Sequence, residues 1–478
     1  MQSYFKITTN KPPLSYRVGE EICIFVRAYN CCNEVPCRYF RFTLQGDDGQ
    51  STTGLGHTRP GEPFVLKTSC ARPGFLHLNC VAYNENNGPD PTFDPYDGGV
   101  GVEPERLEYC DAVPQDYDEF WQQLQKQAED FPLQVVSRQP ITAGVPQGFE
   151  AFDVQIKTPF GRPTSGILTL PKGGKSLPLT VNFCGYGIGN AVVMASKGMI
   201  HFCVNAHGYP NNLPPTETYE KYRDLLGYGF EKSENADPKT AYWYGMMLRD
   251  LIAVQYAKTL PEWNQTDLVM EGGSQGAFQA THMAAKVKGV TFLNLYIPWF
   301  CNLNAENKGY LHGWRPEFTE SLRYYDTAAA ATRVSCPVKI TAYLGDYVCP
   351  PSTVMVLYQS FRTAKGLDFI QGGTHTYRPP EVEAYRFRSL PQNPENKVEP
   401  GLYRHFKGGL YRVLGAALNS ETGEEQVLYR LADGSGPVWC RPQYMFHEVF
   451  LNGGKVTQRF CKEPEPAKKP AAKGFHCP

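Results

Sequence analysis

The stretch that decides the fold is TDLVMEGGSQGAFQATHMAAKV, residues 266–287. A short apolar run meets Gly-Gly-Ser-Gln-Gly at 272–276, and good helix formers follow. The spacing G-x-S-x-G fits a strand that turns sharply into a helix, because glycines admit a turn in which a Cβ atom would clash. The pattern predicts that the Ser274 hydroxyl projects above a sheet at a helix N-terminus, as a nucleophile requires. The alternative is a glycine-rich turn with an idle serine.

Polar residues that would complete a serine-based site follow two later strands. Serine is a weak nucleophile, so a base must take its proton and a carboxylate must orient that base. The run VKITAYLG (338–345) leads into Asp346, and LDFIQGG (367–373) leads into Thr374 and His375. Open α/β sheets place their sites at the C-terminal ends of strands, and the chain order serine, acid, histidine is the expected one. Asp346 and His375 are therefore predicted as acid and base; a turn-forming Asp and a loop histidine are the alternatives.

A site of this kind also needs two backbone N–H groups for the developing oxyanion. One belongs to the residue after the nucleophile, here Gln275. The run LTVNFC (179–184) ends in Gly-Tyr-Gly at 185–187, which would let the Tyr186 amide turn toward the site. A simple glycine-rich turn is the alternative. The scattered histidines show no zinc-like spacing, so neither a metal nor another cofactor is expected.

Changes of pattern along the chain predict four parts. Short strands separated by turn residues fill 1–108 and indicate an immunoglobulin-like β-sandwich. Apolar strands alternate with helical stretches over 109–390, which indicates an α/β domain with a largely parallel sheet. Residues 402–460 read as a small β-barrel, and 461–478 as a disordered tail.

Composition narrows the partners. With 47 Lys and Arg against 48 Asp and Glu, the net charge of -1 creates no field for nucleic acid or an anionic membrane. No window approaches the roughly 20 apolar residues that span a bilayer. The first residues lack the features of a secretory signal, which fits the bacterial cytoplasm. If a leader has been removed, the periplasm or the exterior is the alternative, so the compartment stays open.

Several motifs together resemble the acetyl xylan esterase and cephalosporin C deacetylase family of α/β-hydrolases, over roughly residues 108–388. These motifs are Pro114, Asp116, Phe120 and Trp121, then GYG at 185–187, YWYGMMLRD at 242–250, GGSQG at 272–276 and GDYVCPPST at 345–353. The resemblance implies Ser274 as nucleophile, Asp346 as orienting acid, His375 as base, and Tyr186 with Gln275 as oxyanion donors. It also implies hydrolysis of acetate esters on sugars, with an acetylated carbohydrate as the partner.

Two departures from the family concern the substrate. VNAHGYP (204–210) replaces the usual Arg-Gly-Gln motif, which puts His207 in the pocket wall, and Thr376 replaces a Glu after the catalytic histidine. Trp299, Phe300 and Trp314 are further candidates for sugar contact, with core packing as the alternative. Rival functions are another serine hydrolase (a feruloyl or glucuronoyl esterase, or a peptidase) and a catalytically idle carbohydrate-binding protein. Family members often form rings, so a homo-oligomer is possible.

Overall fold

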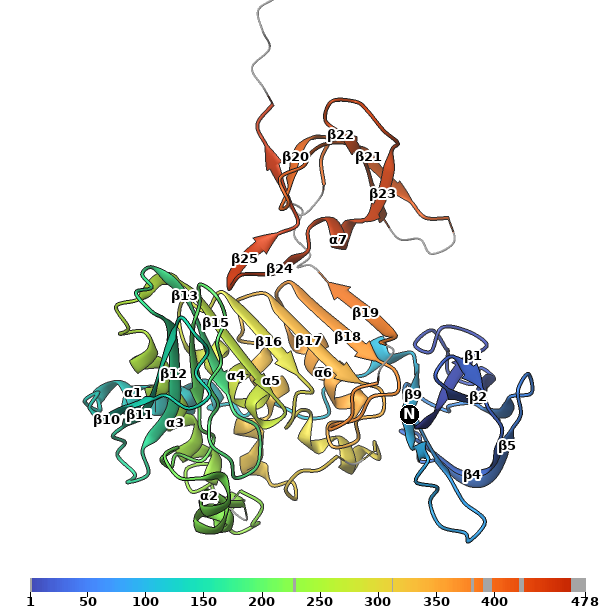
Figure 1. Cartoon of the computed structure of the whole chain (residues 1–478), viewed down its shortest axis with the longest axis horizontal. Helices are drawn as coiled ribbons and strands as arrows, with labels where there is room; N and C mark the ends of the chain where they lie inside the picture. The colour runs from blue at the N-terminus through green and yellow to red at the C-terminus, as the bar shows by residue number, and fades with distance from the viewer. Residues whose placement is uncertain are drawn as a thin grey trace, which may run out of the picture. The chain divides into compact units, whose positions relative to one another are not determined.

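The computed structural model describes residues 2–226, 229–311, 313–379, 382–389, 398–420 and 425–465. The chain divides into two compact units, Met1–Arg388 and Ser389–Pro478. The first unit contains a β-sandwich and a large α/β sheet, and the second is a small β domain (Figure 1). The predicted fold class is therefore confirmed. The residue limits of the four predicted parts stay predictions, and most of the predicted tail, from residue 466 on, lies outside the described residues.

The chain begins with the sandwich. One sheet has the order β3-β2-β1-β8 with β6 also paired to β2, and the other has the order β5-β4-β7-β9. Apolar residues alternate along β2 and β7, so each strand turns one face to a shared core that includes Ile24 and Leu78. The strands of the sandwich are β1 (Ser3–Thr9), β2 (Ile22–Asn30), β3 (Asn33–Glu34), β4 (Cys37–Gly46), β5 (Ser51–Thr58), β6 (Phe64–Thr68), β7 (Gly74–Ala82), β8 (Phe93–Asp94) and β9 (Tyr96–Val102).

The large sheet has the order β10-β11-β12-β14-β13-β15-β16-β17-β18-β19. Its first strands pair antiparallel as far as β14, and β14, β13, β15, β16, β17 and β18 pair parallel. Both faces of the parallel strands are largely buried. This explains why these strands appear in the sequence as nearly continuous apolar runs. The strands are β10 (Val135–Ile141), β11 (Phe149–Ile156), β12 (Thr164–Pro171), β13 (Leu177–Phe183), β14 (Ile200–Val204), β15 (Trp263–Gly273), β16 (Phe292–Tyr296), β17 (Val338–Tyr343), β18 (Lys365–Ile370) and β19 (Ala384–Ser389).

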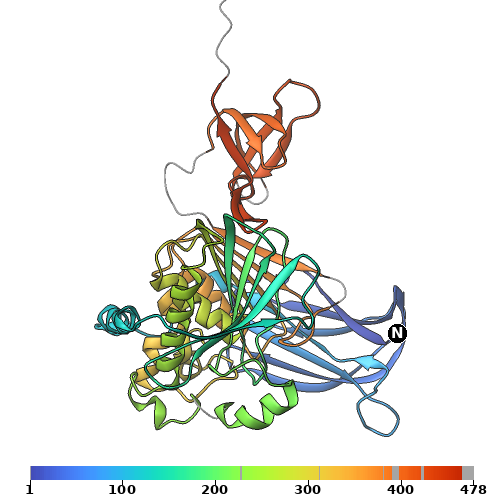
Figure 2. The same ribbon diagram turned by 60° about the vertical axis from the view of Figure 1, so that its left-hand side comes forward.

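The helices form a row in which α1, α3, α4, α5 and α6 contact one another in turn. Figure 2 shows helices gathered on one side of the sheet. Helix α3 is apolar on nearly all sides, so it is buried between its neighbours and the strands. The helices of this unit are α1 (Tyr117–Asp130), α2 (Pro215–Tyr222), α3 (Tyr242–Ala257), α4 (Gln275–Lys286), α5 (Thr327–Ala331) and α6 (Pro351–Ser360), with 3₁₀ turns η1 (Pro104–Arg106), η2 (Arg223–Leu226), η3 (Glu234–Ala236), η4 (Leu303–Lys308) and η5 (Glu320–Tyr325). None of the described helices is long and apolar enough to cross a membrane.

A buried carboxylate joins the sandwich to the α/β part. Asp47, fully buried at the end of β4, accepts hydrogen bonds from the backbone N–H of Phe75 at 2.7 Å and of Leu311 at 2.8 Å. Arg72 donates to the carbonyls of Lys308 at 2.9 Å and Gly309 at 2.7 Å. The sandwich therefore fixes the loop that follows η4.

The second unit is a small β domain with its own core. One sheet has the order β23-β22-β21-β20-β26, and β24 pairs with β25 as a hairpin. Tyr403, Val427 and Phe460 belong to its buried cluster. The elements are β20 (Gly401–His405), β21 (Leu410–Leu418), β22 (Glu425–Leu431), β23 (Trp439–Pro442), α7 (Gln443–Phe446), β24 (Val449–Asn452), β25 (Lys455–Gln458) and β26 (Phe460–Glu463).

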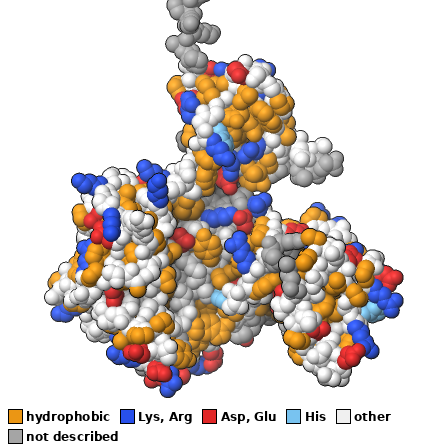
Figure 3. Space-filling model, in the orientation of Figure 1, with side chains coloured by type: hydrophobic (Ala, Val, Ile, Leu, Met, Phe, Trp, Pro, Cys, Tyr) orange, Lys and Arg blue, Asp and Glu red, His pale blue; other side chains and the backbone are white. Residues whose placement is uncertain are grey.

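Surface charge follows the balanced composition. On the face drawn in Figure 3, acidic and basic side chains are interspersed among neutral and apolar ones. No field of one sign extends across this face of the described residues.

Candidate active site

Ser274 lies at the turn between β15 and α4, where the sequence predicted it. Its backbone has φ 54° and ψ -120°, a conformation that is costly for any residue with a side chain. A Cβ atom at Gly276 would lie 2.1 Å from the Phe183 carbonyl oxygen, and one at Gly272 would lie 2.2 Å from the carbonyl oxygen of Gly276. Both glycines of the motif are therefore required by close backbone approach, and the strained turn presents a partly exposed serine.

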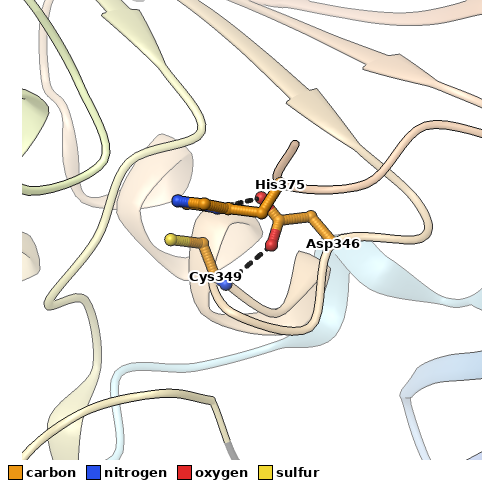
Figure 4. Close-up of side chains that lie close together, drawn as sticks. All are labelled: Asp346, Cys349 and His375. Atoms are coloured by element: carbon orange, nitrogen blue, oxygen red, sulfur yellow. Dashed lines mark hydrogen bonds and ion pairs between the residues drawn. The ribbon is translucent and has the colours of Figure 1, made fainter. Parts of the chain in front are cut away.

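Asp346 and His375 meet at the ends of β17 and β18. The two side chains are joined by a contact of 2.9 Å between His375 Nδ1 and Asp346 Oδ2 (Figure 4). The other oxygen of Asp346 accepts hydrogen bonds from the backbone N–H of Val348 at 3.0 Å and Cys349 at 2.9 Å. Asp346 is 1% exposed, so its carboxylate is held from several sides and orients the imidazole with Nε2 directed away from it.

Cys349 connects this pair to the serine. Burial raises the pKa of its thiol well above the ordinary value, and the neighbouring Ser274 side chain acts in the opposite direction. Figure 4 shows the Cys349 sulfur and the distal nitrogen of His375 extending in the same direction. A direct bond between Ser274 and His375 is not among the contacts of the described residues; catalytic hydrogen bonds of this kind often tighten only when substrate binds.

The same three side chains are the only group of possible metal ligands found within the described residues. Donor atoms of Asp346, Cys349 and His375 lie within 4.8 Å of one another, a set of ligand types that zinc accepts. Two of these residues already bond to each other, which favours proton transfer over metal binding as the use of the cluster.

The two predicted oxyanion donors, Gln275 and Tyr186, lie in segments that adjoin Ser274. Gln275 is the first residue of α4, so its N–H has no acceptor within the helix. The loop that carries Tyr186 lies beside the turn: a Cβ atom at Gly185 would be 3.3 Å from the Gly273 carbonyl oxygen. The Gln279 side chain donates to the Cys184 carbonyl at 2.9 Å and ties this loop to α4. Both predicted oxyanion donors thus come from segments that adjoin Ser274.

The aromatic candidates differ in exposure. Trp299 and Phe300 are each 2% exposed and pack in the core, whereas Trp314 is 37% and Tyr186 is 39% exposed. The rings of Tyr186 and Trp314 lie 4.4 Å apart in an edge-to-face arrangement, and the Trp299 indole N–H donates to the Trp314 carbonyl at 2.5 Å. Trp314 and Tyr186 are accessible to a sugar, and Trp299 holds Trp314 in place.

His207 does not reach the surface. It is 2% exposed, contacts the Tyr242 hydroxyl through Nδ1 at 2.7 Å, and has a pKa lowered to about 3, chiefly by burial. Such burial gives no support for a contact between His207 and substrate.

Two contacts with the sandwich escaped the sequence interpretation. The His77 ring of β7 stacks on Tyr347, the residue after Asp346, at 3.8 Å between centroids. The Gln371 side chain, just before the His375 loop, accepts from Gly99 N–H at 3.0 Å and donates to its carbonyl at 2.8 Å. Nothing in the local sequence marks these pairs, because their members lie more than 250 residues apart in the chain.

Comparisons with known proteins agree with this geometry. The model of the acetyl xylan esterase (AXE1) family matches residues 106–308 and 311–390, and that of a family of unknown function (DUF1653) matches 401–462. The curated acetyl esterase Axe7A of Xylanibacter ruminicola is 27% identical over 343 residues, which cover 67% of this chain and 75% of that protein.

Solved structures that resemble the chain include an acetyl xylan esterase from Paenibacillus sp. R4, with 20% identity and a TM-score of 0.49. Acetyl xylan esterase 1 from Thermoanaerobacterium sp. has 17% identity and a TM-score of 0.48. Each alignment covers 58% of this chain and 94% of the other. Because the first family model matches more than half of the residues, the chain belongs to the acetyl xylan esterase family.

Proposed function

We propose that this enzyme removes acetyl groups from xylan or xylo-oligosaccharides, with Ser274 as nucleophile, His375 as base and Asp346 as the acid that orients it. One observation carries the assignment of residues. The His375–Asp346 pair, joined at 2.9 Å, lies at the same edge of the parallel sheet as the strained turn of Ser274. That is the arrangement a serine hydrolase needs.

The reaction proceeds in two acyl transfers. Ser274 attacks the acetyl carbonyl while His375 Nε2 takes its proton, and the N–H groups of Gln275 and Tyr186 stabilise the oxyanion. As the bond between the acetyl carbon and the sugar oxygen breaks, His375 gives this proton to the leaving oxygen, which departs as a hydroxyl group. A water molecule, deprotonated by His375, then attacks the acyl-enzyme. The ester bond to Ser274 breaks, acetate leaves, and His375 returns the proton to the Ser274 oxygen.

A small cavity beside Cys349 supports a short acyl group. It has a volume of about 10 Å³ and is lined by Trp299, Trp314 and Cys349, whose thiol neighbours the Ser274 side chain. That space holds about one water-sized group. It suits the methyl group of acetate better than a longer or aromatic acyl chain, which distinguishes this proposal from a feruloyl esterase.

The test compares the wild-type enzyme with Ser274→Ala on p-nitrophenyl acetate and acetylated xylo-oligosaccharides. We expect kcat to fall by about six orders of magnitude, as when the nucleophile of a triad is removed. Ser335→Ala, an exposed serine of the same sheet domain, serves as the control and should retain full activity. p-Nitrophenyl butyrate, methyl ferulate and aminoacyl amides should be poor substrates.

Other outcomes reassign the function. Activity retained in Ser274→Ala but abolished by a thiol reagent would move the nucleophile to Cys349. An inactive wild-type enzyme that does not react with a serine-directed phosphonate would favour the idle carbohydrate-binding protein.

A further inference from the structure

A second cavity lies where the sandwich meets the loop of His375. It has a volume of about 270 Å³, close to the lower end for small-molecule sites. Its wall includes Tyr4, Asp94 and Tyr96 from the sandwich and Gln371, Tyr377 and Glu383 from the α/β domain. We propose that this cavity is a saccharide subsite that binds a neutral, unacetylated part of the carbohydrate chain while the candidate triad acts on an acetylated unit.

Two buried polar side chains line the cavity. Tyr96 is 6% exposed, and its hydroxyl is a buried polar atom for which no hydrogen-bond partner is found among the described residues. Gln371 is 7% exposed and is fixed by its two hydrogen bonds to Gly99. Tyr96 and Gln371 therefore form a fixed floor of the cavity, and the hydroxyls of a sugar, which can both donate and accept, would bind the carboxylates of its wall.

Aromatic rings and carboxylates form the walls. The Tyr4 ring is held by a hydrogen bond from its hydroxyl to the Cys31 carbonyl at 2.9 Å, and Tyr377 is 37% exposed. The carboxylate of Glu383 accepts a hydrogen bond from the Tyr385 hydroxyl at 2.5 Å. Flat apolar rings next to hydrogen-bond acceptors match the apolar faces and the hydroxyl rim of a sugar ring.

The charges of the wall select among saccharides. Asp94 and Glu383 contribute two carboxylates, against the single ammonium group of Lys6. Carboxylates accept hydrogen bonds from sugar hydroxyls but repel a uronic acid. The site therefore favours a neutral pentose chain over a glucuronate-substituted one.

Tyr377 connects this subsite to the catalytic residues. It also lines a cavity of about 160 Å³ whose wall contains His375 and Tyr296. Thr374 N–H donates to the Tyr377 carbonyl at 2.9 Å, and Tyr377 N–H donates to the Thr374 hydroxyl at 3.1 Å. The turn from Thr374 to Tyr377 is closed on itself, so the subsite and His375 keep a fixed spacing. This arrangement rests on the proposed function, because one carbohydrate chain would occupy both cavities.

The experiment measures the binding of unacetylated xylotetraose to the full chain carrying Ser274→Ala, by titration calorimetry. We expect measurable binding in this background and a Kd at least about tenfold weaker when Asp94→Ala or Tyr377→Ala is added, the scale of one hydrogen bond to a charged group. Asp130→Ala and Phe160→Ala, exposed residues away from the cavity, are the matched controls and should not change the Kd. Xylotetraose with a glucuronic acid branch should bind no more tightly.

Each other result overturns the inference. Absence of xylotetraose binding, an unchanged Kd in both cavity variants, or tighter binding of the glucuronate-bearing sugar would each do so, provided that the melting temperatures show folded variants. Failure of the proposed function is separate, because it appears as wild-type protein without esterase activity, whereas this binding needs no catalysis.

Discussion

Asp346 can be tested without removing any atom from the core. In Asp346→Asn one carboxylate oxygen becomes an NH₂ group, so the His375 imidazole loses the partner that fixes its tautomer. We expect kcat on p-nitrophenyl acetate to fall by about four orders of magnitude, with a melting temperature close to that of the wild type. A loss of less than tenfold in a folded variant would show that Asp346 does not orient the base.

At the residue scale, the sequence predicted the positions of the polar side chains well. It did not predict which aromatic side chains are buried and which are exposed. Ser274, Asp346 and His375 each follow an apolar strand, and strand ends meet at one edge. An aromatic residue after a strand looks the same whether its ring lines a cleft or fills the core. Trp299 and Trp314 illustrate this, since both were candidates for sugar contact, yet Trp299 is buried and Trp314 is exposed.

At the scale of elements, the junction of β15 with α4 depends on a glycine. In Gly276→Ala the new methyl group would lie 2.1 Å from the Phe183 carbonyl oxygen, so β13 and α4 must separate. We expect a lower melting temperature and at least a hundredfold loss of kcat, roughly the effect of losing an oxyanion donor. Both quantities are measured on the purified variant.

The control for this substitution is Gly245→Ala in α3, where the nearest atom to the new methyl group is Arg249 Nη1 at 3.5 Å. A helical glycine replaced by alanine should stabilise the protein by up to about 1 kcal/mol. Similar melting temperatures for both variants would contradict the close approach at Gly276.

Periodicity in the sequence indicates which helices form, but it indicates less well how each helix ends. Phe120, Trp121 and Leu124 recur at helical spacing, and all three lie buried on one face of α1. Asp116 precedes this helix and is a residue type that caps helices well, yet its side chain makes no capping bond and instead accepts a hydrogen bond from the Tyr324 hydroxyl at 2.5 Å. The orientation of the Asp116 side chain is therefore set by a residue more than 200 positions away in the chain, which no local sequence pattern could indicate.

At the scale of the whole molecule, Asp47 couples the stability of the sandwich to that of the α/β domain. Asp47→Ala leaves the N–H groups of Phe75 and Leu311 without their acceptor, at a cost of about 1–3 kcal/mol for each buried group. We expect a lower melting temperature in calorimetry of the full chain. An unchanged melting temperature would contradict the coupling.

The loss of stability in Asp47→Ala should also depend on pH. Burial raises the pKa of Asp47 to about 6 from 3.8, so the folded protein binds this proton more tightly than the unfolded chain does. The contribution of the group to the free energy of unfolding is therefore largest below pH 4 and falls by up to about 3 kcal/mol as the pH rises through 6. The difference in melting temperature between wild type and Asp47→Ala should accordingly be larger at pH 5 than at pH 8.

Asp47, His77 and Gly99 of the sandwich contact the α/β domain, and these contacts bear on how the two parts evolve. All three residues precede position 106, where the match to the esterase family starts. A gene rearrangement that cut there would strip the catalytic half of the partners of Leu311, Tyr347 and Gln371. We therefore expect the sandwich and the hydrolase to be inherited together as one unit.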